Sequence, residues 1–215
     1  MLLPRTSVRP AASAHRPVAT ALGIALLALT LVAGPTAAAT KIVTVDNSHS
    51  FSPTSVTISR GDTVRWRSEA TFEDHDVFGT KPSSYFSSGP AGGIDPGESY
   101  SKAFKSAGTF PYVCRVHDGM DGEVRVTMGG SRIVDGGVVK FKLNVASQAL
   151  SSSSPFRHVV WVDTPSAGWQ VFKTTTKKTV TYVPSASGTY FFASEVKRVS
   201  NGTSSFLSPV RSLTK

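Results

Sequence analysis

A short loop between residues 114 and 120 constrains this chain more than any other feature. Cys114, His117 and Met120 follow one another at even three-residue steps, between two runs in which apolar and polar residues alternate. Thiolate, imidazole and thioether are soft ligands, and a His2Cys trio with a weak axial Met is the geometry of a blue-copper electron-transfer site. The loop lacks one histidine of that set. His75, far upstream, is the candidate for the missing ligand.

Four short motifs occur in a fixed order around this loop. They are Phe51-Ser52-Pro53, then Gly61-Asp62-Thr63-Val64-x-Trp66, His75-x-Val77 and Gly108-Thr109-Phe110-x-Tyr112-x-Cys114-x-x-His117-x-x-Met120. In order and spacing, residues 51–128 resemble a cupredoxin of the plastocyanin and amicyanin type. The resemblance implies one type 1 copper site that alternates between Cu(I) and Cu(II). His75, Cys114 and His117 would be its equatorial ligands and Met120 its axial ligand, with His117 as the surface port for electrons.

Two positions depart from the pattern of that family. Asp76 follows the first histidine, where these proteins commonly have Asn, and Val116 stands where plastocyanins and amicyanins usually have Pro. An ionised Asp only accepts hydrogen bonds, so either the ligand loops are tied less tightly or Asp76 is protonated. Val116 restores a backbone N–H that can reach the sulfur of Cys114.

The N-terminus has the pattern of a secretory signal peptide over residues 1–39. Three arginines and no acidic residue precede an apolar run from Val18 to Ala33, and small residues follow up to Ala39. Cleavage near Ala39 would place the mature protein outside the cytoplasm, secreted or in the cell envelope. The alternative is an uncleaved membrane anchor, because the apolar run is close to the minimum of about 17 residues.

Cys114 is the only cysteine of the chain, so no intramolecular disulfide can form. An odd cysteine in an exported protein needs an explanation. Metal ligation explains it, and an inert buried thiol is the alternative.

The mature chain has the pattern of an all-β protein with two domains. Short alternating runs separated by turns predict a Greek-key β-sandwich, the cupredoxin domain, over residues 40–128. Residues 79–99, rich in Gly, Ser and Pro, predict a long surface loop. Gly129-Gly130-Ser131 breaks the alternation and is the expected domain boundary.

Residues 129–215 again show strand patterns. Their closing stretch, from Gly188 to Pro209, is similar to the last hairpin of fibronectin type III domains, which implies a second sandwich of the fibronectin type III or immunoglobulin kind. Trp161 and Tyr190 are the expected core anchors. The segment has no cluster of ligand residues, so we expect a binding or spacer module.

The charge of the chain is divided unevenly. Residues 40–128 carry nine Lys/Arg and eleven Asp/Glu, whereas residues 129–215 carry eleven Lys/Arg and three Asp/Glu. The basic half suggests contact with an anionic envelope polymer or lipid surface; a merely soluble basic surface is the alternative. Nucleic acid is not an expected partner for an exported protein. The remaining histidines, His15, His49 and His158, are expected to be surface or structural residues.

These patterns predict a one-electron carrier that serves redox partner proteins and is not an enzyme. No Ser-His-Asp order, phosphate-binding glycine loop or carboxylate pair indicates catalysis. The alternative is a protein that captures or delivers copper in the envelope, because the same four ligands serve both purposes. A third possibility is an adhesion module that keeps the fold incidentally, and the intact ligand set argues against it.

Overall fold

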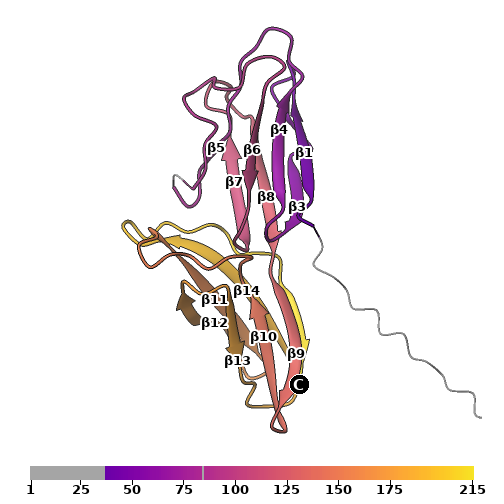
Figure 1. Ribbon diagram of the computed structural model, residues 1–215, viewed down its shortest axis with the longest axis vertical. Helices are drawn as coiled ribbons and strands as arrows, with labels where there is room; N and C mark the ends of the chain where they lie inside the picture. Colours follow the sequence, from indigo (N-terminus) through magenta and orange to yellow (C-terminus); the bar gives the residue numbers. More distant parts are fainter. Residues whose placement is uncertain (1–36, 84) are drawn as a thin grey trace, which may run out of the picture. The chain divides into compact units, whose positions relative to one another are not determined.

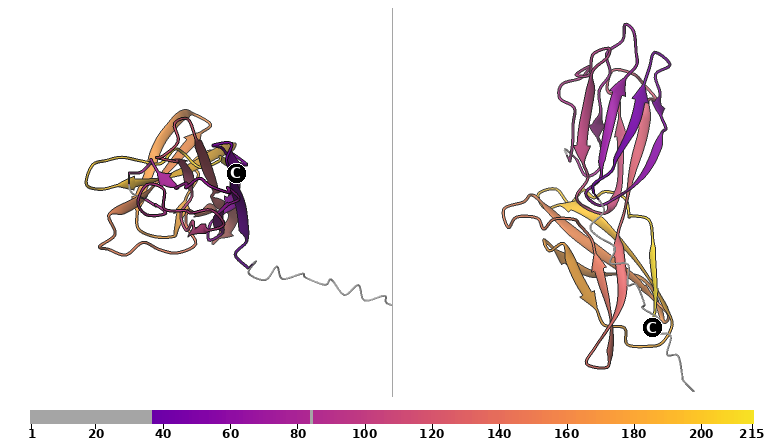
Figure 2. Two further views of the ribbon diagram at one scale, coloured as in Figure 1. Left: turned by 90° about the horizontal axis from the view of Figure 1, so that it is seen from above. Right: turned by 45° about the vertical axis from the view of Figure 1, so that its right-hand side comes forward.

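The computed structural model describes residues 37–83 and 85–215, and residues 37–215 form one compact unit. Residues 1–36, which hold most of the expected signal peptide, lie outside this description. In the described part of the chain, no helix has the length and apolar character needed to cross a membrane. Strands and loops make up the coloured ribbon in both figures, as expected for an all-β protein (Figures 1 and 2).

The N-terminal half, residues 37–128, contains two four-stranded sheets, ordered β2-β1-β4-β6 and β3-β8-β7-β5. Strand β1 runs parallel to β4 and β3 runs parallel to β8, while the other neighbours are antiparallel. The strands are β1 (Thr40–Val45), β2 (Phe51–Ser52), β3 (Ser55–Ser59), β4 (Thr63–Ser68), β5 (Phe78–Gly79), β6 (Ser99–Ala103), β7 (Gly108–Val113) and β8 (Asp121–Thr127).

Alternation along these strands builds the core between the two sheets. Val64 and Trp66 on β4 are fully buried, whereas Arg65 between them is exposed. On the facing sheet, Val124 and Val126 of β8 are buried in the same cluster. This period of two is what places one face of each sheet in the core. The expected sandwich is therefore present in the N-terminal half.

The C-terminal half, residues 129–215, contains two further sheets, ordered β13-β10-β9 and β12-β11-β14-β15. Their strands are β9 (Gly129–Asp135), β10 (Val138–Asn144), β11 (Phe156–Thr164), β12 (Ala167–Thr175), β13 (Thr179–Tyr182), β14 (Thr189–Arg198) and β15 (Arg211–Thr214). Phe141, Tyr190 and Phe192 form the aromatic centre of this core. Tyr190 is buried as expected, but Trp161 is only half-buried and donates to the Glu195 carboxylate instead of anchoring the core.

The structure adds detail to two further expectations. Gly129 and Gly130 begin β9 only one residue after β8 ends, so a single residue, Met128, connects the strands of the two halves. Between residues 79 and 99 the chain is mostly loop, yet Phe86 and Ile94 are buried in the N-terminal core. These two side chains supply apolar volume that anchors an otherwise mostly exposed segment to the core.

The two halves share buried contacts. Thr109 of β7 and Phe206 exchange backbone hydrogen bonds of 2.9 Å in both directions. The ring of His158, fully buried, bonds the Ser106 hydroxyl and the Lys177 carbonyl. Burial lowers the pKa of His158, so its ring is neutral and acts as a structural link. Val196 belongs to the N-terminal core cluster. The halves are thus joined by packing as well as by the chain.

Candidate metal centre

Two segments at one end of the N-terminal sandwich carry the proposed ligands. His75 lies between β4 and β5, where its backbone N–H and C=O exchange hydrogen bonds of 3.0 and 2.8 Å with Ile94. The other ligands lie in the loop from β7 to β8. There the Cys114 N–H donates to the Met120 carbonyl over 2.9 Å, and the Met120 N–H donates to the His117 carbonyl over 3.4 Å. Backbone hydrogen bonds therefore fix both ligand segments.

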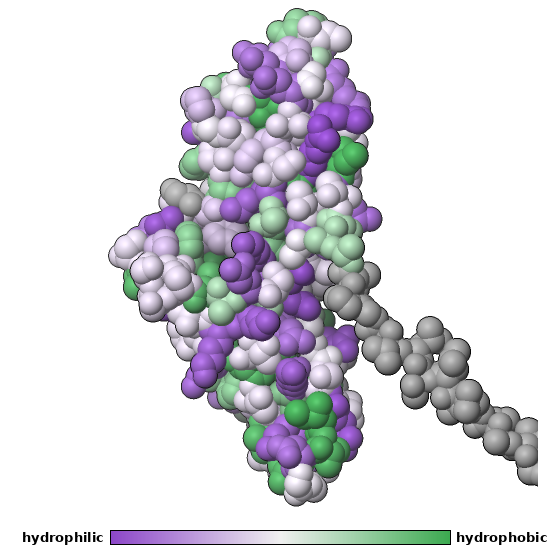
Figure 3. All heavy atoms as spheres, in the orientation of Figure 1, coloured by the Kyte–Doolittle hydropathy of each residue, from purple (hydrophilic) through white to green (hydrophobic). Residues whose placement is uncertain are grey.

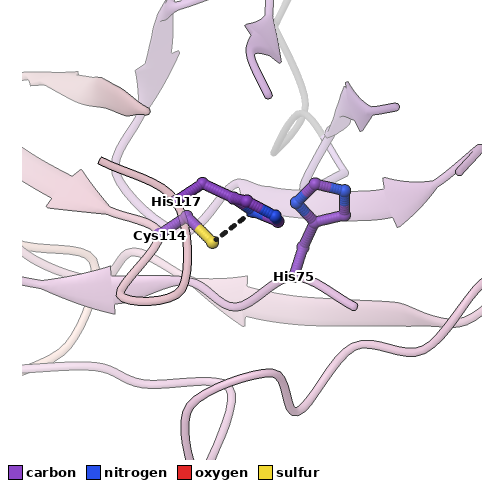
Figure 4. A group of neighbouring side chains, drawn as sticks. All are labelled: His75, Cys114 and His117. Atoms are coloured by element: carbon purple, nitrogen blue, oxygen red, sulfur yellow. Dashed lines mark hydrogen bonds between the residues drawn. The ribbon is translucent and has the colours of Figure 1, made fainter. Parts of the chain in front are cut away.

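The structure brings His75, Cys114 and His117 together (Figure 4). One donor atom from each of the three side chains lies within 4.8 Å of the others. The Cys114 Sγ is 3.5 Å from the His117 Nδ1, and the ring centroids of His75 and His117 are 4.7 Å apart. Met120 follows in the same loop and is 2 % exposed. The side chains form a compact group of soft donors at the end of the sandwich.

The surroundings of His75 fit a bound metal ion. Its ring is fully buried, and among the described residues neither ring nitrogen has a hydrogen-bond partner. A buried polar atom without a partner is costly, and a metal ion would satisfy one of these two. Burial and the neighbouring His117 lower the pKa of His75, so its lone pair is available. A soft or borderline cation suits this set of two imidazoles and a thiolate.

The sulfur of Cys114 is surrounded by backbone N–H groups. Burial raises the pKa of the Cys114 thiol, and hydrogen bonds from the backbone N–H groups of Asp76, Val116 and His117 oppose that rise. The Asp76 N–H lies 3.4 Å from the sulfur. The sequence indicated the Val116 donor, but the Asp76 donor was missed because it comes from the segment that carries the other histidine. These donors favour the thiolate, which is the form that binds metal.

Asp76 ties the two ligand segments together. Its carboxylate is fully buried and accepts hydrogen bonds from the Arg115 backbone N–H, at 2.6 Å, and from the Arg115 Nε, at 2.5 Å. The Arg115 guanidinium also donates to the Gly89 carbonyl and lies over the ring of Phe78. The looser loop or protonated Asp76 expected from the sequence is therefore not needed. An ionised Asp can only accept, and Arg115 supplies the donors.

His49 has a neighbourhood that sequence reasoning missed. Its ring stacks on that of His117, with centroids 4.1 Å apart and planes 14° from parallel. The His49 Nε2 is 2.6 Å from a carboxylate oxygen of Glu73. No spacing pattern could have indicated this arrangement, because the two loops that carry His49 and Glu73 meet only in the folded sandwich.

Comparisons with known proteins place the N-terminal half in a family. Residues 38–127 match the family of copper-binding proteins described as plastocyanin/azurin. Chloroplastic plastocyanin of Tetradesmus obliquus is 36 % identical over 120 residues, which cover 54 % of this chain and 82 % of that protein. Plastocyanin of Scenedesmus fuscus is 39 % identical over 83 residues, which cover 35 % of this chain and 85 % of that protein.

One solved structure completes the comparison. An oxidised mutant of amicyanin is 25 % identical, with a TM-score of 0.35 and coverage of 40 % of this chain and 79 % of amicyanin. The sequence relatives decide the assignment: a plastocyanin is more than one-third identical over four-fifths of its own length. This chain therefore belongs to the plastocyanin/azurin family of copper-binding proteins.

Proposed function

We propose that the chain is an exported one-electron carrier with a single type 1 copper site. His75, Cys114 and His117 would hold the metal equatorially, and Met120 would be the weak axial ligand. The observation that carries the proposal is the convergence of the three donors around a buried His75 whose ring nitrogens have no other partner among the described residues. When bound, copper supplies the one-electron couple Cu(II)/Cu(I). No substrate is transformed in this proposal.

The protein's own contribution would be to keep the ligands in place. The two oxidation states of copper prefer different geometries. Ligands held rigidly in an intermediate geometry would keep the structural change on electron transfer small. Ile94 fixes the His75 backbone, Met120 closes the Cys114 loop, and the Asp76–Arg115 pair joins the two segments. His117 is half-buried and lies closest to solvent among the three. It would be the place where redox partner proteins exchange electrons with the site.

A redox-cycling experiment tests this function. The copper-loaded mature protein, residues 40–215, should be intensely blue. It should be reduced and reoxidised repeatedly by small redox proteins or inorganic couples without losing its metal. A protein that releases copper to a chelator on each reduction would instead be a copper capture or delivery protein. That alternative keeps some support from the His49–Glu73 pair beside His117, because extra donor groups at the surface suit metal transfer.

Export rests on the sequence pattern of residues 1–39. In this proposal the signal peptide is removed near Ala39, and the protein works in the cell envelope or after secretion.

The potential of the site should respond to the backbone at Val116. Replacing Val116 by Pro removes an N–H that stabilises the Cys114 thiolate. A hydrogen bond to this sulfur withdraws electron density and favours Cu(I), so its loss should lower the reduction potential by about 50 mV. Cyclic voltammetry measures the change. Val116→Ala, which keeps the N–H, is the control. If the Pro variant keeps an unaltered blue band and its reduction potential stays constant or rises, the Val116 N–H does not donate to the Cys114 sulfur.

The basic C-terminal half should bind an anionic surface, either envelope polymer or lipid. The charge count supports this proposal, and the cations that line hollows are divided between two of them. Lys173 and Lys177 line one hollow, whereas Lys197 lines another with Arg157. In Figure 3, apolar side chains collect over the β9–β10 hairpin, where Ile133, Val134 and Val138 are exposed. That hairpin would not add to the electrostatic attraction between the protein and an anionic surface.

Binding to anionic vesicles should therefore be weak and strongly dependent on salt. We expect the mature protein to be retained at low ionic strength and released near physiological salt, where the screening length is about 8 Å. Replacing Lys173, Lys177 and Lys178 by Gln should weaken retention several-fold.

A matched control replaces three exposed cations of the N-terminal half, Lys41, Arg65 and Arg67, by Gln. This variant should be retained like the wild type. Retention that is indifferent to salt, or equally weakened in both variants, would leave the C-terminal half as a spacer.

A further inference from the structure

His49, Glu73 and His117 form a second group of donors directly outside the first. One donor atom from each residue lies within 4.8 Å of the others. His49 is exposed, and Glu73 and His117 are half-buried. His117 is thus common to two groups: an inner one with His75 and Cys114, and this outer one at the surface. The two groups differ in chemistry, because the outer one has a carboxylate where the inner one has a thiolate.

Hydrogen bonds hold the outer group in place. The loop from β1 to β2 turns at Asp46, whose carboxylate accepts from the Ser48 N–H over 2.9 Å and whose carbonyl accepts from the His49 N–H over 3.4 Å. His49 has a φ of 55°, in the left-handed region that non-glycine residues seldom adopt. The structure therefore maintains an uncommon backbone conformation at the residue whose ring covers His117.

A second set of bonds fastens this loop to the segment that carries Glu73. The Asn47 side chain donates to the Thr71 hydroxyl over 2.9 Å and accepts from the Thr71 N–H over 3.1 Å. With both ends fixed, His49 Nε2 lies 2.6 Å from the Glu73 carboxylate. An exposed pair of this kind contributes little to stability by itself. The pair also lies against His117, a proposed metal ligand, because the His49 ring stacks on the His117 ring.

Two imidazoles and a carboxylate are a suitable donor set for a divalent cation such as Cu²⁺ or Zn²⁺. We propose that His49, Glu73 and His117 form a second metal site, on the solvent side of His117, which holds a divalent cation while the inner site is empty. Since the inner site belongs to the proposed copper function, the order of filling rests on that function. The outer donor group itself does not.

The shared histidine should make the two sites mutually exclusive. A neutral imidazole has one nitrogen with a free lone pair and one that carries a proton. His117 Nδ1 is 3.5 Å from the Cys114 sulfur. A proton on Nδ1 would donate to that sulfur and leave the lone pair of Nε2 for the outer site. A metal bound to Nδ1 in the inner site reverses this arrangement, and the outer site then loses one of its three donors.

The equilibrium test uses a chain in which the inner site is blocked by His75→Ala and Cys114→Ala. Circular dichroism checks that it folds, and calorimetric titration with Cu²⁺ measures binding. We expect one Cu²⁺ per chain, with affinity reduced about tenfold or more by adding His49→Ala or Glu73→Gln. Adding Asp74→Asn removes an exposed neighbouring charge outside the group and should change affinity less than twofold. No binding, or binding indifferent to His49→Ala, would overturn the proposal.

A kinetic test needs no change to the buried ligands. Metal-free wild-type protein is mixed with one equivalent of Cu²⁺, and samples frozen at intervals are examined by electron paramagnetic resonance. An early Cu²⁺ species without the thiolate absorption band should decay as the blue band grows, and His49→Ala should lack it. Growth of the blue band without this species, alike in both proteins, would refute the outer site. Failure of any blue band to form, with the early species retained, would instead refute the proposed function.

Discussion

Replacing Cys114 by Ser should abolish the blue colour of the copper-loaded protein completely. The colour of a type 1 site comes from charge transfer between a cysteine thiolate and Cu(II). Cys114 is the only cysteine in the chain, so no other residue can supply that thiolate. A serine hydroxyl offers a harder oxygen donor, which binds Cu(II) without this intense transition. Visible absorption of the copper-loaded variant, with copper content measured separately, gives the result.

Met120→Leu is the matched control for that experiment. An axial Met is a weak, long ligand that tunes the potential more than it builds the site. This variant should therefore stay blue and change only its reduction potential. A Cys114→Ser protein that remained blue would contradict the ligand assignment, and so would a Met120→Leu protein that lost copper altogether.

Replacing Arg115 by Gln should cost about 3 kcal/mol of folding stability in the metal-free protein. The Asp76 carboxylate is fully buried, and Arg115 supplies its side-chain partner. Removing the charged partner of a fully buried carboxylate leaves that charge uncompensated, which is among the most destabilising of single changes. Urea unfolding of the metal-free protein measures the loss without any contribution from metal binding.

A second substitution separates charge from packing in this experiment. Asp76→Asn removes the buried charge, so the double variant with Arg115→Gln should recover most of the lost stability. Arg67→Gln breaks an exposed ion pair with Glu69 and should cost less than about 1 kcal/mol. If Arg115→Gln were as mild as Arg67→Gln, Asp76 would not depend on Arg115.

The sequence predicted much of the N-terminal half because its signals are local. Alternation along β4 marks Val64 and Trp66 as inward-facing, and this needs no knowledge of the partner strand. The proposed ligands were found in the same way. Three of them occur in seven consecutive residues, and the histidine that this set lacks pointed upstream to His75. The family membership and the all-β fold are confirmed, while the ligand set and the domain boundary remain proposals.

Sequence reasoning failed where the answer depends on contacts between distant segments. Asp76 was judged by its own chemistry, as a residue that can only accept, and its donor Arg115 belongs to the other ligand segment. His49 is exposed, as expected, but nothing near it in sequence indicated its contact with His117. Trp161 was expected in the core from its size, but its indole N–H has a carboxylate partner at the half-exposed surface. In each case, tertiary contacts override a local preference.

Strand β7 separates the junction with the C-terminal half from the proposed metal site. It begins at the junction with the C-terminal half, where Thr109 is bonded to Phe206, and it leads directly to Cys114. At about 3.4 Å per residue, the two positions are about 17 Å apart along the strand. Electron tunnelling weakens steeply with distance, so a redox group held at the C-terminal half would exchange electrons with the sulfur only slowly. If the C-terminal half attaches the protein to a surface, as proposed, electron exchange would then depend on the other end of β7, where His117 is the proposed port.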